Sequence, residues 1–150
     1  TLLERVPSGR GDWKPHAKSM PLGELAMHLA GLPLWLALAF GGDDFDTNPP
    51  GGPAYRTPAF TDTSTLVAAF DASVAAGREA ISQAADDAFT TSWALKSGGH
   101  VVLSMPRSAV VRRFVLNHLF HHRGQLSVYL RLLDVPLPSI YGPTADMKQG

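Results

Sequence analysis

The sequence predicts an all-α protein, an up-and-down four-helix bundle with a small β-hairpin before its last helix. Three stretches repeat apolar residues at spacings of three and four, which is the helical period. Proline and glycine separate these stretches, and a helical stump, residues 1–6, precedes them. The 150 residues, 45% hydrophobic and 17% charged, suffice for one core and hardly two, so we expect a single domain over residues 1–150. Because the chain starts inside the stump and not with Met, we expect the first helix to be truncated.

The first long stretch predicts a helix from Ser19 to about Phe40. Ser19 is the expected N-cap, and Pro21 and Glu24 suit a first helical turn. Pro33 lacks a backbone N–H donor, so we expect a kink at that position. The expected inward face is Leu22, Leu25, Leu29, Leu32 and Leu36.

A connection rich in proline and glycine, residues 41–62, separates this helix from the next one. It shows no period, which is typical of a functional or mobile loop. The second helix is expected from Thr63 or Ser64 to about Asp87, with Gly77 as its weak point. Its expected inward face is Leu66, Val67, Phe70, Val74 and Ile81.

The last third of the chain predicts the hairpin and the longest helix. Residues 92–105 change to an alternating pattern on either side of Ser97-Gly98-Gly99, which is typical of a hairpin turn. Pro106 opens a helix that runs to about Leu133, and its ~28 residues would span roughly 42 Å. Its expected inward stripe is Val111, Val115, His118, His122, Gln125 and Tyr129.

Composition and charge exclude several classes of function. Thirteen basic and thirteen acidic residues give no net charge, whereas proteins that bind phosphates of nucleic acids are usually basic. The absence of cysteine excludes disulfides, thiolate metal sites and cysteine nucleophiles. The longest apolar run, residues 32–40, is well short of the ~20 residues of a membrane span, and no signal peptide is visible. We therefore expect a cytoplasmic protein without membrane contact, and the balanced charge argues against a nucleic-acid partner.

Three of the six histidines fall where a helical core should be dry. His118 and His122 are four residues apart and so lie on one apolar helix face, and His28 shares a face with Leu25 and Leu29. A buried imidazole needs hydrogen-bond partners, and a divalent cation satisfies several nitrogens at once. Spacing alone leaves a metal site and ordinary core histidines equally open. The other histidines, expected at the surface, are His16, His100 and His121.

Residues 117–126, Asn-His-Leu-Phe-His-His-Arg-Gly-Gln-Leu, resemble the signature helix of the DinB/YfiT-like superfamily. Residues 13–19, Trp-Lys-Pro-His-Ala-Lys-Ser, with Leu-Ala-Met-His at 25–28, resemble its second signature. The resemblance covers nearly the whole chain and implies a four-helix bundle in which His28, His118 and His122 hold a divalent metal. Zinc or nickel is expected before iron or manganese. The resemblance also implies a homodimer, and better understood relatives are thiol-dependent transferases and isomerases.

A metal with three neutral ligands keeps open coordination positions, which is the pattern of catalytic metal sites. A bound water or thiol would then become a nucleophile at neutral pH. Gln125 and Tyr129 are candidates to orient a ligand or contact the substrate. Arg123 is a candidate to pair with an acidic substrate group, and Glu24 to act as a base or outer acceptor. Each also has a purely structural interpretation: helix packing, an ion pair, or a favourable charge in a first turn.

Three functions remain open. The first is a metal-dependent transferase or hydrolase, thiol-dependent or not, that acts on a small molecule. The second is a non-catalytic, metal-stabilised module for binding or dimerisation. Nucleic-acid binding is the third; the balanced charge and the lack of a base-reading motif oppose it. The observation in favour of nucleic-acid binding is the set of arginines on the last helix, which are Arg107, Arg112, Arg113, Arg123 and Arg131. We favour the first function.

Overall fold

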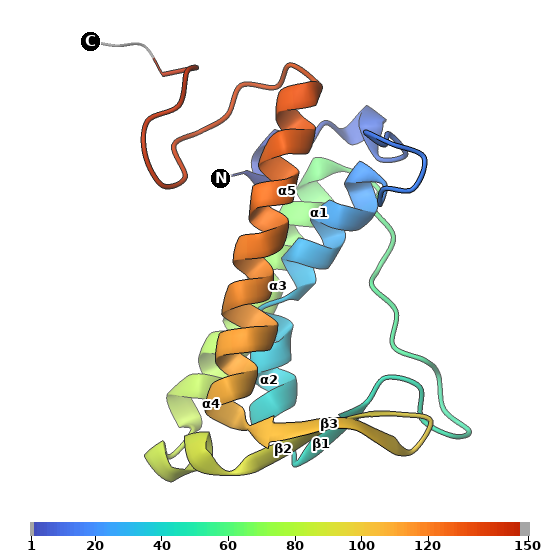
Figure 1. Ribbon diagram of the computed structural model, residues 1–150, viewed down its shortest axis with the longest axis vertical. Helices are drawn as coiled ribbons and strands as arrows, with labels where there is room; N and C mark the ends of the chain where they lie inside the picture. The colour runs from blue at the N-terminus through green and yellow to red at the C-terminus, as the bar shows by residue number, and fades with distance from the viewer. Residues whose placement is uncertain (1, 148–150) are drawn as a thin grey trace.

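Three helical rods lie side by side along the long axis of the computed structural model, and a small sheet lies at one end of them (Figure 1). The structure describes residues 2–147. The first rod consists of α1 (Leu22–Gly31) and α2 (Leu34–Phe40), and the second is α3 (Thr63–Gln83). The third rod consists of α4 (Arg107–Val110), a π-helical segment (Val111–Asn117) and α5 (His118–Leu132). α3 packs against α1 and α2, and α1 packs against α5.

The fourth rod of the predicted bundle is not present within residues 2–147. The N-terminal residues instead form two 3-10 turns, Leu3–Arg5 and Ser8–Arg10. The first of these turns packs against α3, and Leu2, Leu3 and Val6 are buried in the main core. The predicted stump at residues 1–6 is therefore a packed turn, with Thr1 outside the described residues.

The first rod is two helices and not the single kinked helix predicted from Ser19 to Phe40. Pro33 has no backbone N–H to donate, and α1 ends at Gly31, just before it. α2 starts again after Pro33, at an angle of 40° to α1. The predicted cap is also wrong, because α1 begins directly after Pro21 and the N–H of Ser19 is used in the preceding turn.

α3 begins where the sequence predicts, because an acidic side chain caps it. The carboxylate of Asp62 accepts a hydrogen bond from the backbone N–H of Thr65 at 2.8 Å, which satisfies one free donor of the first turn. The helix ends at Gln83 and not at Asp87 as predicted. The chain then becomes extended before a short 3-10 helix, Asp86–Thr90.

The buried face of α3 differs from the predicted one. Leu66, Ser73 and Gly77 are buried, and Phe70 packs on the core. A Cβ atom on Gly77 would lie 2.6 Å from the carbonyl oxygen of Pro33, so only glycine lets α3 approach the first rod this closely. Gly77 is therefore a packing contact and not a weak point. The prediction was also wrong for three residues that are only half-buried: Val67, Val74 and Ile81.

The predicted hairpin is present and gains a third strand. β2 (Ser92–Ser97) and β3 (His100–Pro106) pair antiparallel, and Gly98 and Gly99 turn between them with φ of +64° and +79°. β1 (Asp44–Asp46), from the long connection, pairs parallel with β2. The carboxylate of Asp46 accepts hydrogen bonds from the two glycine N–H groups at 3.1 and 2.7 Å. A strand of three residues is too short to show a period, so the sequence did not reveal it.

The third rod has nearly the predicted ends but is not α-helical throughout. Its segment Val111–Asn117 is π-helical, so each turn there holds more residues than an α-helical turn. Val110 and Val115, five residues apart, are both buried as a result. The expected inward stripe is wrong at Gln125, which is exposed, whereas its other members are buried or half-buried. The wide turns end directly before His118.

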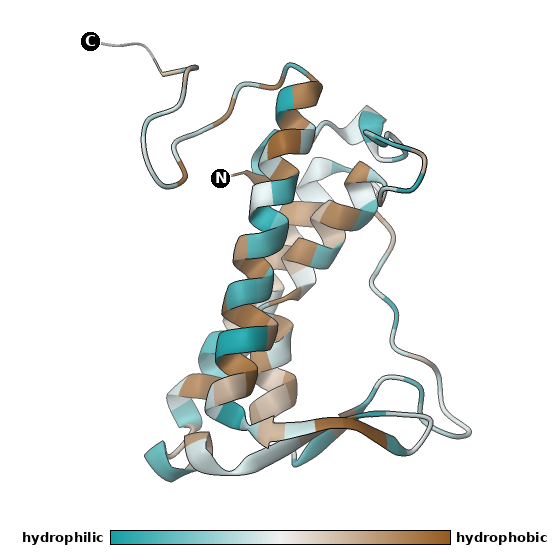
Figure 2. Ribbon diagram, in the orientation of Figure 1, coloured by the Kyte–Doolittle hydropathy of each residue, from teal (hydrophilic) through white to brown (hydrophobic). Residues whose placement is uncertain are grey.

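Two apolar clusters hold the rods and the sheet together. Figure 2 shows hydrophobic and hydrophilic residues alternating along α5. The larger cluster joins the three rods and includes Leu22, Leu25, Leu66, Leu126 and Leu130. The smaller cluster is centred on Ala39, Trp93 and Val110. Within residues 2–147 no helix alone is long and apolar enough to cross a membrane, and α1 with α2 passes that test only as a bent pair.

Candidate metal centre

Three histidines from two packed helices meet between α1 and α5. His28 lies on α1 between core leucines, and His118 and His122 lie one turn apart on α5. The three ring centroids are 4.6 to 4.9 Å apart. All three side chains are half-buried. The packing of α1 on α5 thus brings together the three residues that the sequence singled out.

The spacing of the ring nitrogens suits one small cation. Nε2 of His28 and Nε2 of His118 are 3.2 Å apart. Two nitrogens bound at about 2.0–2.1 Å to a tetrahedral zinc ion lie roughly 3.3 Å from each other. One possible ligand atom from each of the three histidines lies within 4.8 Å of the other two. The cluster could therefore hold a metal ion with nitrogen ligands.

Burial favours the neutral form of two histidines of this cluster, His28 and His118, and neutral imidazole is the form that a metal needs. Burial, and after it the charges of His122 and His118, lower the pKa of His28 to about 4. Burial is also the largest cause that lowers the pKa of His118, while a hydrogen bond with the backbone of Phe114 opposes this shift. Neutral imidazole offers a free lone pair, and such ligands suit zinc, nickel, iron and copper.

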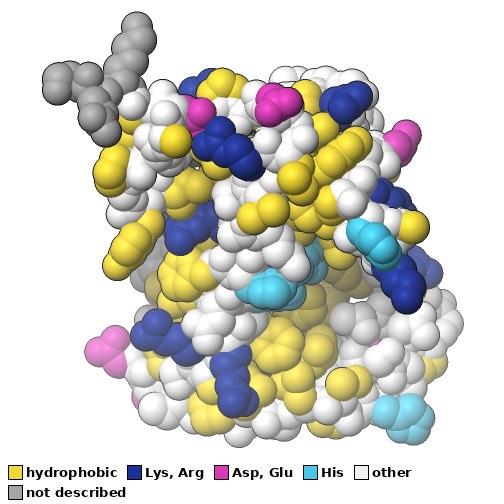
Figure 3. Space-filling view, turned by 45° about the horizontal axis from the view of Figure 1, so that its top comes forward, with side chains coloured by type: hydrophobic (Ala, Val, Ile, Leu, Met, Phe, Trp, Pro, Cys, Tyr) yellow, Lys and Arg dark blue, Asp and Glu magenta, His cyan; other side chains and the backbone are white. Residues whose placement is uncertain are grey.

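A cavity of about 450 Å³ lies beside His28, between α1 and the end of the long connection. Figure 3 shows histidine side chains at the surface next to a hollow bordered by hydrophobic side chains. Phe60 forms one wall of the cavity, and Gly11 and Gly23 make room for it, since a Cβ atom on either glycine would lie 2.7 Å from Phe60. Sequence reasoning missed Phe60, because the loop that contains it has no hydrophobic period.

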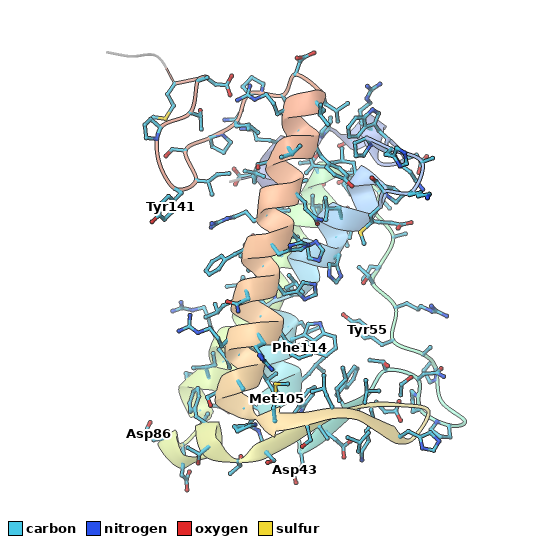
Figure 4. The ribbon with its side chains drawn as sticks, viewed as in Figure 1. Asp43, Tyr55, Asp86, Met105, Phe114 and Tyr141 are labelled. Carbon is cyan, nitrogen blue, oxygen red and sulfur yellow. The ribbon has the colours of Figure 1, made fainter. Side chains whose placement is uncertain are left out.

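Tyr55 is a second residue of the long connection that sequence reasoning missed. Its backbone N–H donates to the carbonyl of Thr47 at 2.7 Å, and its ring makes edge contacts with Trp35 and Phe45. Figure 4 shows its side chain pointing from the connection toward the helices, on the side where Phe114 lies. Burial raises the pKa of the Tyr55 hydroxyl. The only available signal was an aromatic residue within a loop of proline and glycine.

Comparison with known proteins assigns the family. The sequence model of the DinB family matches residues 2–149. The chain belongs to the DinB family. The resemblance carried by the two histidine signatures is thus confirmed.

The fold is also that of DinB-like proteins. A crystal structure of a DinB-like protein from Bacillus cereus ATCC 10987 matches with a TM-score of 0.69 and 23% identity, over 93% of this chain and 86% of the other. A crystal structure of the DinB-like protein YjoA from Bacillus subtilis matches with a TM-score of 0.67 and 18% identity, over 93% and 87%. No curated protein matches the sequence.

The other candidate residues of this DinB-family chain fall into two groups. Gln125 and Glu24 lie at the histidine cluster: Oε1 of Gln125 is 2.6 Å from Nδ1 of His122, and Glu24 lines the cavity with His28. Tyr129 and Arg123 are packed against other side chains. The Tyr129 ring makes an edge contact with Trp13 at 5.8 Å, and the Arg123 guanidinium lies 5.1 Å from the ring centre of Phe120.

The remaining histidines and arginines of the DinB-family chain differ in how far they are exposed. His16, His100 and His121 are exposed, as the sequence predicts, although the His121 ring is 4.8 Å from that of His122. Arg107 is buried, and Arg131 pairs with Asp146 at 2.5 Å. Arg112 and Arg113 are exposed.

Proposed function

We propose that this DinB-family protein is a metal-dependent enzyme that transfers or hydrolyses a group of a small molecule. The observation that carries the proposal is the meeting of His28, His118 and His122 beside a cavity that could admit a substrate. Three neutral ligands leave coordination positions open, which distinguishes catalytic from structural metal sites. We propose zinc or nickel as the metal, and iron or manganese as the alternatives.

Different residues of the chain would have different roles in such a site. The three histidines would hold the metal, which when bound lowers the pKa of a coordinated water or thiol toward neutrality. Gln125 accepts the hydrogen bond of the His122 ring, so it holds that ring in one tautomer. α1 and α5 fix the ligands on helices and not on loops, and this keeps their geometry constant.

A non-catalytic function is favoured by a different feature of the same site. The histidines come from two rods, so a cation bound between them would cross-link α1 to α5. Metal that stabilises the native state contributes its binding free energy to folding. The second candidate is therefore a metal-stabilised module that binds a ligand or a second subunit without turnover.

Elemental analysis of protein purified without a histidine tag tests the proposal. We expect about one metal ion per chain in the wild type and in His121→Ala, an exposed control on the same helix, and loss of the metal in His122→Ala. A wild-type chain that is free of metal and unaffected by chelators would contradict the proposal. That result would mean that His28 and His118 only share a hydrogen bond.

Turnover and melting temperature then separate the two candidate functions. For an enzyme, a screen of small esters, amides and electrophiles should find a reaction that His122→Ala loses while the variant stays folded at the assay temperature. For a binding module, His122→Ala should lower the melting temperature clearly, and no substrate in the screen should turn over.

A further inference from the structure

The cavity beside His28 has walls of two chemical kinds. One wall is apolar and is formed by Met20, Pro21, Pro58 and Phe60. The rest of the lining includes two carboxylates, those of Asp12 and Glu24. Among the described residues that line it there is no lysine or arginine. The lining therefore carries negative charge next to an apolar surface.

Neither carboxylate is neutralised by a partner within the described part of the chain. The ion pairs of residues 2–147 do not include Asp12 or Glu24, and neither side chain accepts a hydrogen bond there. Both residues are exposed to solvent. Their charges are thus available to a ligand that enters the cavity.

The position of Glu24 on α1 sets its distance from His28 along the helix axis. Glu24 and His28 are four residues apart on one helix, so both side chains lie on the same face. Four residues correspond to a rise of roughly 6 Å along the helix axis. A molecule that reaches the histidine cluster with one end would place a group about one helical turn away beside Glu24.

Phe60, one residue of the apolar wall, is packed closely against the protein itself. Phe60 sits against Gly11 and Gly23, where added Cβ atoms would lie 2.7 Å from its side chain. A preformed apolar wall favours a ligand with a rigid apolar body, because ordering the wall on binding costs little.

We infer that this cavity binds small molecules with an apolar body and a positively charged nitrogen, held by Asp12 and Glu24 about one helical turn from the histidine cluster. The inference rests on the proposed metal-dependent function. The two carboxylates attract the cationic end and offset its repulsion by a metal ion, whereas they disfavour a ligand that is anionic at that end.

Three rigid thiols that differ only in their para substituent test this inference. They are 4-(aminomethyl)benzenethiol, 4-(hydroxymethyl)benzenethiol and 4-mercaptobenzoate, and none can chelate a metal through both ends. Binding to the full chain loaded with Co²⁺ is followed by the thiolate-to-cobalt charge-transfer absorption. We expect the aminomethyl probe to bind about tenfold more tightly than the hydroxymethyl probe, the size expected of two partly solvated ion pairs. The carboxylate probe should bind most weakly.

Substitutions assign the preference to the two carboxylates. Glu24→Gln and Asp12→Asn should each reduce the ratio between the aminomethyl and hydroxymethyl probes about two- to fivefold, and the double variant should abolish it. Asp71→Asn on α3, which does not line the cavity, is the control and should keep the full ratio.

The outcomes distinguish a failure of this inference from a failure of the proposed metal-dependent function. Cobalt binding with equal affinities for the three probes would overturn the inference and leave the metal centre in place. A preference for the aminomethyl probe that persists in the double variant would also overturn the inference, because the ammonium group would then bind somewhere other than at Asp12 and Glu24. Failure of the chain to bind Co²⁺ would overturn both.

Discussion

Nδ1 of His122 donates a hydrogen bond to Oε1 of Gln125, which is 2.6 Å away and one turn further along α5. An amide oxygen can only accept, so this contact places the ring proton on Nδ1. The lone pair of Nε2 is then free to bind a metal. A short contact between two residues three apart on one helix thereby determines which atom of His122 the site presents.

Loss of this hydrogen bond should weaken metal binding without unfolding the protein. Gln125 is exposed, so Gln125→Leu should fold. Removing an outer partner of a histidine ligand typically costs 10- to 100-fold in affinity, and we expect a decrease of about that size. Competition with a chromophoric chelator measures it. Gln125→Glu keeps an acceptor and should retain tight binding, and equal affinities for the wild type and Gln125→Leu would refute the role.

The metal-free protein should lose stability as the pH falls below about 6.5. The pKa of His28 is lowered to about 4 by burial, then by His122 and His118, whereas a histidine in an unfolded chain has a pKa near 6.5. Between these values the unfolded state binds a proton that the native state does not, so the free energy of unfolding decreases as the pH falls and this loss is complete only below about 4.

Urea unfolding in the presence of a chelator measures this pH dependence. The midpoint should be lower at pH 5 than at pH 7.5 in the wild type and in His121→Gln, whose side chain is exposed. The difference should shrink in His28→Gln, which has no imidazole to protonate. An identical drop in His28→Gln would mean that other groups cause it.

Two helical glycines should respond in opposite directions to substitution by alanine. A Cβ atom on Gly77 would lie 2.6 Å from the carbonyl oxygen of Pro33, so Gly77→Ala should destabilise the protein by about 1–3 kcal/mol. Gly124, on α5, has nothing within 4 Å of the same position, and Gly124→Ala should stabilise it by about 0.5–1 kcal/mol. Thermal or urea unfolding gives both values, and equal signs would contradict the close packing of α3.

Arg107 should be essential for stability, because its guanidinium joins α2 to the sheet. Its Nε donates to the carbonyl of Ala39 at 2.6 Å and its Nη2 to that of Gly42 at 2.7 Å. Arg107→Met leaves the buried carbonyl of Ala39 and the partly buried carbonyl of Gly42 without this donor and should cost roughly 3–5 kcal/mol. Arg107→Lys should not rescue it, because an ammonium lacks the planar fork.

An exposed arginine of the same rod is the matched control for Arg107. Arg112→Met should change the free energy of unfolding by no more than about 0.5 kcal/mol. Asp43→Asn should also have little effect, since 96% of the Asp43 side chain is exposed beside Arg107. If Arg112→Met were as harmful as Arg107→Met, charge and not the buried hydrogen bonds would be responsible.

The sequence by itself determined the helices, the hairpin and the histidines of the site. Local periodicity shows which residues share a face, so the last helix, the second helix and the pair His118 and His122 followed from spacing alone. The predicted start of the second helix, Thr63 or Ser64, agrees with the start of α3 at Thr63. The order and flanks of the two signatures identified the family and with it the role of His28 as a candidate ligand.

Only the tertiary structure decided how these elements meet. The break after Gly31, the π-helical turns before His118 and the inward side of α3 depend on contacts between rods, which a one-dimensional pattern does not contain. The same is true of the cavity, because Phe60 reaches α1 from a loop without a period. Spacing along a helix fixes which residues can face a neighbour, but the packing of that neighbour fixes which of them do.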